Sequence, residues 1–111
     1  MNETEHATKI RTLNDAFRRT GRGGRILLTQ GIQALGQKAV AEIIAKVRAF
    51  DQFNEGNDPY QEHDFGKIVN GHDVVLWKID YYDRAMEFHS PDPADPAVTT
   101  RVMTVMLGEE Y

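Results

Sequence analysis

The sequence FGKIVNGHDVVLWKIDY, residues 65–81, decides the fold of this chain. Its two apolar runs flank Asn70-Gly71, the residue pair that best tolerates the positive φ angles of a two-residue type I′ turn. The stretch therefore predicts a β-hairpin, with one strand over 65–69 and the other over 73–81.

A turn at Asn70-Gly71 also fixes which residues face each other across the hairpin. The run 74–77, VVLW, shows no alternation of polar and apolar residues. We therefore expect the second strand to be central in its sheet, with both faces covered. The expected cross-strand pairs are Phe65 with Leu76, Lys67 with Val74, and Asp64 with Trp77.

The residues before the hairpin predict two helices, a strand and a loop. Apolar residues at helical spacing predict a helix over 4–20, which Gly21 would end. A short apolar run bounded by glycines predicts a strand over 25–30, and an apolar stripe with interspersed alanines predicts a helix over 33–50. Residues 51–62 predict a long loop, which in a small domain is typical of a functional or mobile segment.

The residues after the hairpin predict a further strand over 85–89 and a last helix over 97–107. Asp95-Pro96 supplies an N-cap and a first-turn proline for this helix, although its β-branched residues leave a strand as the alternative. The element order is then α-β-α-β-β-β-α. This order predicts an α+β fold, with helices packed on a small antiparallel or mixed sheet, as a single domain over residues 1–111.

Composition excludes several classes of protein. The chain has 111 residues and no cysteine, which excludes disulfides, thiolate zinc sites and a cysteine nucleophile. Its apolar runs are far shorter than the about 20 residues of a membrane span, and its polar N-terminus is unlike a signal peptide. We therefore expect a cytoplasmic protein.

The net charge of −4 is unevenly distributed along the chain. Residues 1–50 hold nine Lys and Arg against four Asp and Glu, whereas residues 51–111 hold four against thirteen. Such an asymmetry steers charged partners or pairs the two parts with each other.

Acidic residues and a histidine gather at the end of the hairpin away from its turn. Oxygen-rich ligands of this kind suit magnesium, manganese or calcium better than zinc, and a histidine among them suits a general base. Strand-end carboxylates that only cap loops are the structural alternative. The candidate interaction or metal cluster is Glu62, His63, Asp64, Asp80, Tyr82, Asp83 and Glu87.

A second candidate site is an arginine cluster near the first glycines. Guanidinium groups bind phosphates or a partner's carboxylates. Aromatic residues are not interleaved with the cluster and the whole chain is acidic, so we do not expect nucleic acid as the main partner. The candidate anion-binding residues are Arg18, Arg19, Arg22 and Arg25.

Four stretches of the sequence resemble a small proteobacterial family known only as a domain of unknown function. They are Asn57-Asp58-Pro59, EHDFG at 62–66, WKIDYYD at 77–83 and DPADPAVTTRV at 92–102. The helix IRTLNDAFRR at 10–19 looks like the start of the same family. The resemblance implies no reaction. It implies a place on plasmids and other accessory elements, and a role in host–element conflict or plasmid maintenance through a protein partner.

These observations favour a non-enzymatic protein that binds a protein partner through an acidic surface, without a cofactor. A metal-dependent hydrolase or nuclease built on His63, Asp64, Asp80 and Asp83 is the alternative, with a divalent metal as its cofactor. A nucleic-acid binder that uses the arginine cluster is the third hypothesis. A homodimer is also expected from the edges of so small a sheet.

Overall fold

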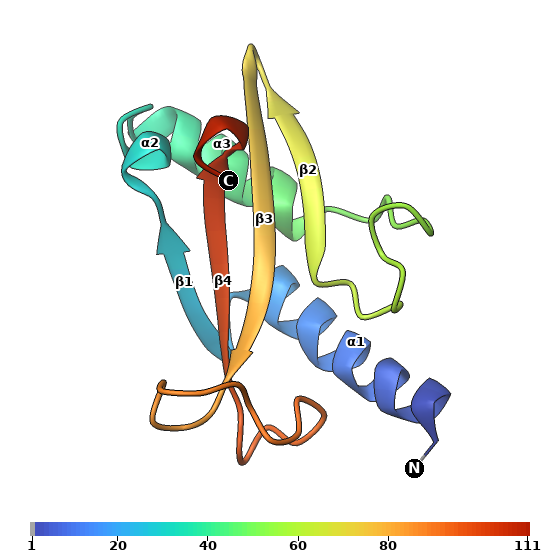
Figure 1. Ribbon diagram of the computed structural model, residues 1–111. Helices are drawn as coiled ribbons and strands as arrows, with labels where there is room; N and C mark the ends of the chain where they lie inside the picture. Colours follow the sequence, from blue (N-terminus) through green and yellow to red (C-terminus); the bar gives the residue numbers. More distant parts are fainter. Residues whose placement is uncertain (1) are drawn as a thin grey trace.

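The computed structural model describes residues 2–111, which form helices and one sheet (Figure 1). Asn2 caps the first helix by accepting a hydrogen bond from the Glu5 amide, and Gly21 ends it with a φ of 75°. The elements are α1 (Glu3–Thr20), β1 (Gly24–Leu28), α2 (Gln30–Gln33), α3 (Gln37–Arg48), β2 (Phe65–Asn70), β3 (Asp73–Tyr82), β4 (Thr100–Leu107) and the 3₁₀ helix η1 (Gly108–Glu110).

The four strands form one mixed sheet in the order β1-β4-β3-β2. β1 pairs with β4 in parallel, and the other neighbours are antiparallel. The first and last strands of the chain therefore lie side by side (Figure 1). The predicted α+β class is confirmed.

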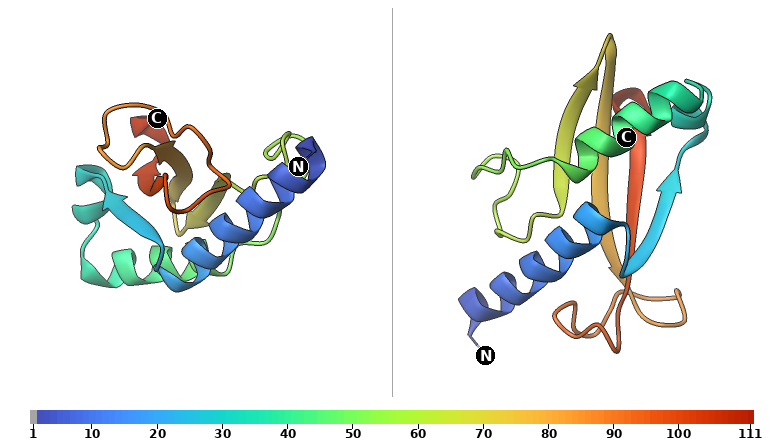
Figure 2. Two further views of the ribbon diagram at one scale, coloured as in Figure 1. Left: turned by 90° about the horizontal axis from the view of Figure 1, so that it is seen from below. Right: turned by 180° about the vertical axis from the view of Figure 1, so that it is seen from behind.

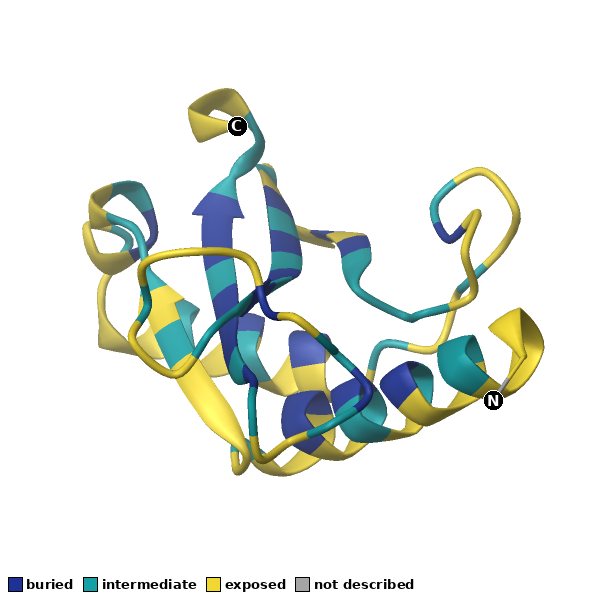
Figure 3. Ribbon diagram, turned by 60° about the horizontal axis from the view of Figure 1, so that its bottom comes forward, coloured by how far each residue is buried: buried dark blue, intermediate teal, exposed yellow. Residues whose placement is uncertain are grey.

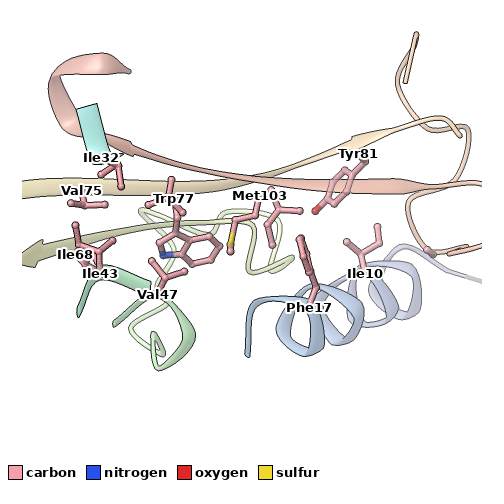
Figure 4. Close-up of a cluster of buried hydrophobic side chains, with 13 residues drawn as sticks. Ile10, Phe17, Ile32, Ile43, Val47, Ile68, Val75, Trp77, Tyr81 and Met103 are labelled. Carbon is pink, nitrogen blue, oxygen red and sulfur yellow. The ribbon is translucent and has the colours of Figure 1, made fainter. Parts of the chain in front are cut away.

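Helices α1 and α3 lie on the same face of the sheet, as the view from behind shows (Figure 2). Val47 points from α3 toward Trp77 of β3, and Phe17 points from α1 toward the sheet beside Met103 (Figure 4). All four side chains are buried. The core thus fills the space between one helical layer and one face of the sheet. None of the helices within residues 2–111 combines the length and the apolarity that a membrane span requires.

Two glycines allow this close packing. A Cβ atom on Gly24 would lie 2.6 Å from the Arg101 carbonyl oxygen and 2.7 Å from the Phe17 ring. A Cβ atom on Gly66 would lie 2.7 Å from the Trp77 indole. Only a residue without a side chain fits at either position.

The hairpin forms, but its register differs from the expected one. Asn70 pairs with Asp73 and Phe65 with Lys78, so that Gly71 and His72 are the turn residues. Gly71 has a φ of 63° in the first turn position, which is typical of type II′, the turn that competes with type I′. Every partner moves by two residues, so each side chain keeps its expected face of the sheet.

The predicted strand β3 is central, but its second face is not covered by a layer of helices. Its buried residues alternate with partly exposed ones, and Val74 is 42% exposed. Figure 3 shows that burial differs across the sheet: β4 is buried over most of its length, whereas β1 at the edge is largely exposed. Charged residues such as Lys78 and Asp80 occupy the uncovered face, where they form an ion pair of 3.0 Å.

Three other expected elements also differ. The predicted helix 33–50 begins only at Gln37 as α3, directly after Gly36 with a φ of 94°, and the short helix α2 at 30–33 precedes it. The predicted strand 85–89 is a turn with a single bridge between Tyr82 and His89. The predicted helix 97–107 is instead β4, the strand alternative, because its β-branched residues pair with β1 and β3 on either side.

Candidate functional site

The three consecutive residues Glu62, His63 and Asp64 do not act together. His63 has a positive φ of 55°, so the chain turns sharply at this residue. Its imidazole contacts α1 and the loop before it, whereas Glu62 contacts Tyr81 of β3. The cluster expected from the sequence is therefore divided into separate groups.

His63 lies between two carboxylates that the sequence analysis did not connect with it. Its Nδ1 atom is 2.9 Å from Asp15, and its Nε2 atom is 3.5 Å from Asp58. Phe53 stacks on the imidazole at 3.7 Å, and Asp58 accepts a hydrogen bond from the His63 amide. The Nδ1 atom is hydrogen-bonded to Asp15 and the Nε2 atom lies near Asp58, so this geometry fixes the loop to α1.

Arg18 lies behind this pair and is fully buried. Its guanidinium donates to Asp15 at 2.9 Å and to the Phe50 carbonyl at 3.1 Å. Burial alone would raise the pKa of Asp15, but hydrogen bonds from His63 and Arg18 outweigh it and hold the pKa below its usual value. Arg18 is thus committed to the core and is not available to an external anion.

A second buried polar group links the same loop to β4. The Tyr81 hydroxyl donates to a Glu62 carboxylate oxygen at 2.8 Å. The side-chain amide of Asn14 donates to the Tyr81 hydroxyl, also at 2.8 Å. Arg101 donates to the Asn14 side-chain oxygen at 2.8 Å. Burial and the charge of Glu62 raise the pKa of Tyr81, so this phenol remains protonated.

Asp64 and Asp80 lie at the end of the hairpin away from its turn, as expected from the sequence. Together with Tyr82 and His89 they line a small open pocket of about 330 Å³. Burial and the nearby charge of Glu62 raise the pKa of Asp64 to about 6. Within residues 2–111, no cation lies within ion-pair distance of Asp64, whereas Asp80 pairs with Lys78.

Asp83 and Glu87 belong to the turn after β3. Asp83 accepts hydrogen bonds from the amides of Glu87 and Phe88, and its own amide donates to the Phe88 carbonyl at 2.8 Å. The turn is therefore held in shape by Asp83. It presents Phe88 to solvent with 70% of its surface exposed.

The comparisons with known proteins place residues 28–110 in one family. These residues match the family described as "Protein of unknown function (DUF3768)". The chain belongs to this family. No curated protein and no solved structure matches the chain.

The DUF3768 match includes the hairpin, the Asp83 turn and β4, but it begins after most of β1. It includes the four stretches at 57–59, 62–66, 77–83 and 92–102 that carry the resemblance, so the expected membership of a family of unknown function is confirmed. Asp15 and Arg18 lie in α1, outside the matched residues.

The residues of the metal hypothesis are not brought together in this DUF3768 protein. Among residues 2–111, no three His, Asp or Glu side chains are placed to share a metal ion. His63 is turned toward Asp15, away from Asp64 and Asp80, and Asp83 is used in its own turn. The hydrolase alternative therefore finds no support in the geometry.

The arginine cluster is also divided. Arg18 is buried and Arg19 is exposed on α1, whereas Arg22 and Arg25 line a pocket at the start of β1. Two further arginines, Arg84 and Arg101, line the same pocket. Local sequence could not connect them with Arg22 and Arg25, because they are more than fifty positions away in the chain.

Proposed function

We propose that this DUF3768 protein is a non-enzymatic binding protein that docks on a basic protein partner through Phe88 and the carboxylates near it. The observation that carries the proposal is the exposed Phe88 on a turn with a defined shape. The carboxylates belong to Asp80, Asp83 and Glu87.

Phe88 contributes little to the stability of the chain itself. Most of its ring is in water, yet hydrogen bonds to Asp83 hold the turn, and the Ser90 amide donates to the Tyr81 carbonyl at 3.0 Å where the turn ends. An aromatic side chain presented on an ordered turn is pre-organised for binding, because little conformational entropy is lost when a partner covers it.

The charge around Phe88 favours a basic partner. Glu87 is the neighbouring residue and is exposed, and Asp80 and Asp83 are partly exposed on the same end of β3. Residues 51–111 carry thirteen acidic residues against four basic ones, so the field of this part of the chain attracts positive charge. A role in host–element conflict or plasmid maintenance, as the family resemblance implies, is the biological setting that we propose for this contact.

The proposal is tested by site-specific photo-crosslinking in the native host. A photoreactive phenylalanine analogue is placed at position 88, and in a matched control at position 60, where Tyr60 is 78% exposed on the loop 51–64. We expect one protein adduct from position 88 that position 60 does not give. Equal adducts from both positions, or none from position 88, would contradict the proposal.

The captured protein is then purified and its affinity is measured. Phe88→Ala is expected to weaken binding by about tenfold or more, as a central aromatic contact does. Glu87→Lys is expected to slow association and to reduce its dependence on salt. Tyr60→Ala is the control and should bind as the unmodified chain does. An adduct of twice the mass of the chain would show self-association instead and would contradict the choice of partner.

A further inference from the structure

The pocket at the start of β1 is lined by four arginines and no acidic residue. Its lining residues come from α1, the start of β1, β4 and the loop 83–99. This loop folds under the ends of β1 and β4 (Figure 1). Its volume is about 510 Å³, which is within the range of small-molecule sites. The arginines are Arg22, Arg25, Arg84 and Arg101.

Arg101 is one of the residues that line this pocket and is only 3% exposed. Its Nε atom donates to Asn14 at 2.8 Å and its Nη2 atom donates to the Pro93 carbonyl oxygen. Its guanidinium also lies 5.3 Å from the centre of the Tyr81 ring. All these partners are neutral, so the hydrogen bonds orient the guanidinium but do not neutralise it.

A buried cation of this kind is costly. Within residues 2–111, no carboxylate lies within ion-pair distance of Arg101. The charge of Glu62 favours the charged guanidinium from a distance, and Glu62 is linked to it by hydrogen bonds through Tyr81 and Asn14. Burial nevertheless lowers the pKa of Arg101. Buried charges in proteins are normally paired, and one without a counter-ion indicates that the counter-ion comes from outside the chain.

The other three arginines add charge at the mouth of the pocket. Arg22, Arg25 and Arg84 are exposed, and within the described residues their side chains form no ion pair. Thr100, which also lines the pocket, has a hydroxyl that can donate to an anion. Thr99 is already committed, because its hydroxyl donates to the Asp92 carbonyl at 2.8 Å.

We propose that this pocket binds the phosphate group of a small phosphorylated ligand. The phosphate would lie on the Arg101 guanidinium, with Arg22, Arg25 and Arg84 closing around it. Arg84 lies on the turn that also presents Phe88, but the pocket includes neither Phe88 nor the carboxylates of Asp80, Asp83 and Glu87, so the two proposals can fail separately.

A phosphate dianion fits the pocket better than a carboxylate or a nucleic-acid backbone does. Guanidinium groups donate two parallel hydrogen bonds to phosphate oxygens, and four cations balance a double charge better than the single charge of a carboxylate. A nucleic-acid backbone requires a basic face along its path, whereas this chain has a net charge of −4 and confines these arginines to one pocket.

The test is a titration of the full chain with inorganic phosphate at pH 7.5 and constant ionic strength, followed by NMR. We expect saturable shifts of the Arg101 side-chain Nε–H signal and of the amides of residues 22–25 and 99–101. Sodium acetate at the same ionic strength should bind at least tenfold more weakly. Shifts that do not saturate, or that lie elsewhere in the chain, would overturn the proposal.

Variants at exposed positions distinguish binding in the pocket from nonspecific attraction by positive charge, and they do not disturb the core. The double variant Arg22→Gln, Arg84→Gln should weaken phosphate binding by tenfold or more. Arg19→Gln removes an exposed charge outside the pocket and should leave binding unchanged. Equal losses in both variants would overturn the proposal.

A final experiment tests whether the phosphate belongs to a small ligand or to a nucleic-acid backbone. A ten-nucleotide single-stranded DNA without a terminal phosphate should bind no more tightly than inorganic phosphate. Tighter binding of this DNA, with an affinity that falls steeply with salt, would overturn the small-ligand assignment in favour of a nucleic-acid surface.

Discussion

The Nδ1 atom of His63 lies 2.9 Å from the Asp15 carboxylate, and this contact fastens the start of the hairpin to helix α1. The same carboxylate receives a hydrogen bond from the fully buried Arg18. The Asp15 carboxylate therefore binds both His63 and Arg18, and its loss would remove both contacts.

The substitution Asp15→Asn should destabilise the protein by about 3 kcal/mol, because it leaves the buried Arg18 without a carboxylate partner. The measurement is urea unfolding followed by the fluorescence of Trp77, the single tryptophan of the chain. Asp51→Asn, at an exposed position, is the control and should change the free energy of unfolding by less than about 0.5 kcal/mol. A loss below about 1 kcal/mol for Asp15→Asn would show that Arg18 does not depend on this carboxylate.

Asp64 should make stability fall as pH rises. Its pKa of about 6 in the folded chain exceeds the about 3.9 of an unfolded aspartate, so the folded state binds more protons between these two values. The stabilising contribution of protonated Asp64 is therefore complete below about pH 4 and is lost as the pH passes through 6.

Asp64→Asn should remove this dependence. We expect the variant to be more stable than the unmodified chain at pH 7 by about 1 kcal/mol, since solvent screening reduces the full value of a two-unit shift. The difference should vanish near pH 4. Unfolding curves at several pH values measure it, with the exposed Glu55→Gln as the control. An Asp64→Asn variant that is less stable at pH 7 would refute the expectation.

Glu110 holds η1 against α2. It accepts hydrogen bonds from the Thr29 hydroxyl at 2.6 Å, the Leu107 amide at 2.7 Å and the Gly31 amide at 3.1 Å. These bonds, that from Thr29 first, lower the pKa of Glu110. Glu110→Ala should speed hydrogen exchange at the Gly31 and Leu107 amides, whereas the neighbouring Glu109→Ala should not. Unchanged exchange in Glu110→Ala would mean that these bonds do not protect the amides.

Gly66→Ala should destabilise the chain by about 2–4 kcal/mol, because the new methyl group would overlap the Trp77 indole and the Phe50 ring. Gly56→Ala is the control. Its Cβ atom would meet only Asn54, at 3.1 Å, and the expected loss is below about 1 kcal/mol. Thermal unfolding measures the stability of both variants. Equal losses of stability would show that the close contact between Gly66 and Trp77 does not determine the effect of Gly66→Ala.

The sequence predicts those parts of the fold that depend on local patterns. Helix α1 follows from the spacing of its apolar residues, and the hairpin from Asn70-Gly71. The hairpin register was wrong, because Gly71 fits the first position of a type II′ turn as well as the second of type I′. The helix expected over 97–107 was wrong because pairing with β1 and β3, which lie far away in the chain, determines its conformation.

The candidate site depends still more on distant contacts. His63 was singled out, but Asp15 lies 48 positions before it and nothing in the local sequence connects them. Likewise, the spacing of Arg22 and Arg25 gives no sign that Arg84 and Arg101 complete their pocket. The positive φ at His63 could not be predicted either, because histidine tolerates this conformation more readily than most residues but does not require it.

The parallel pairing of β1 with β4 has a consequence for folding during translation. β1 is made early, yet within the described residues it pairs in the sheet only with β4, the strand at 100–107, which follows it far along the chain. Until then the backbone groups of β1 have no partner strand, and α1 has no completed surface beneath it. The nascent chain therefore reaches its native state only after β4 has been made and has left the ribosome. A ribosome stalled before residue 100 would hold a protease-sensitive intermediate.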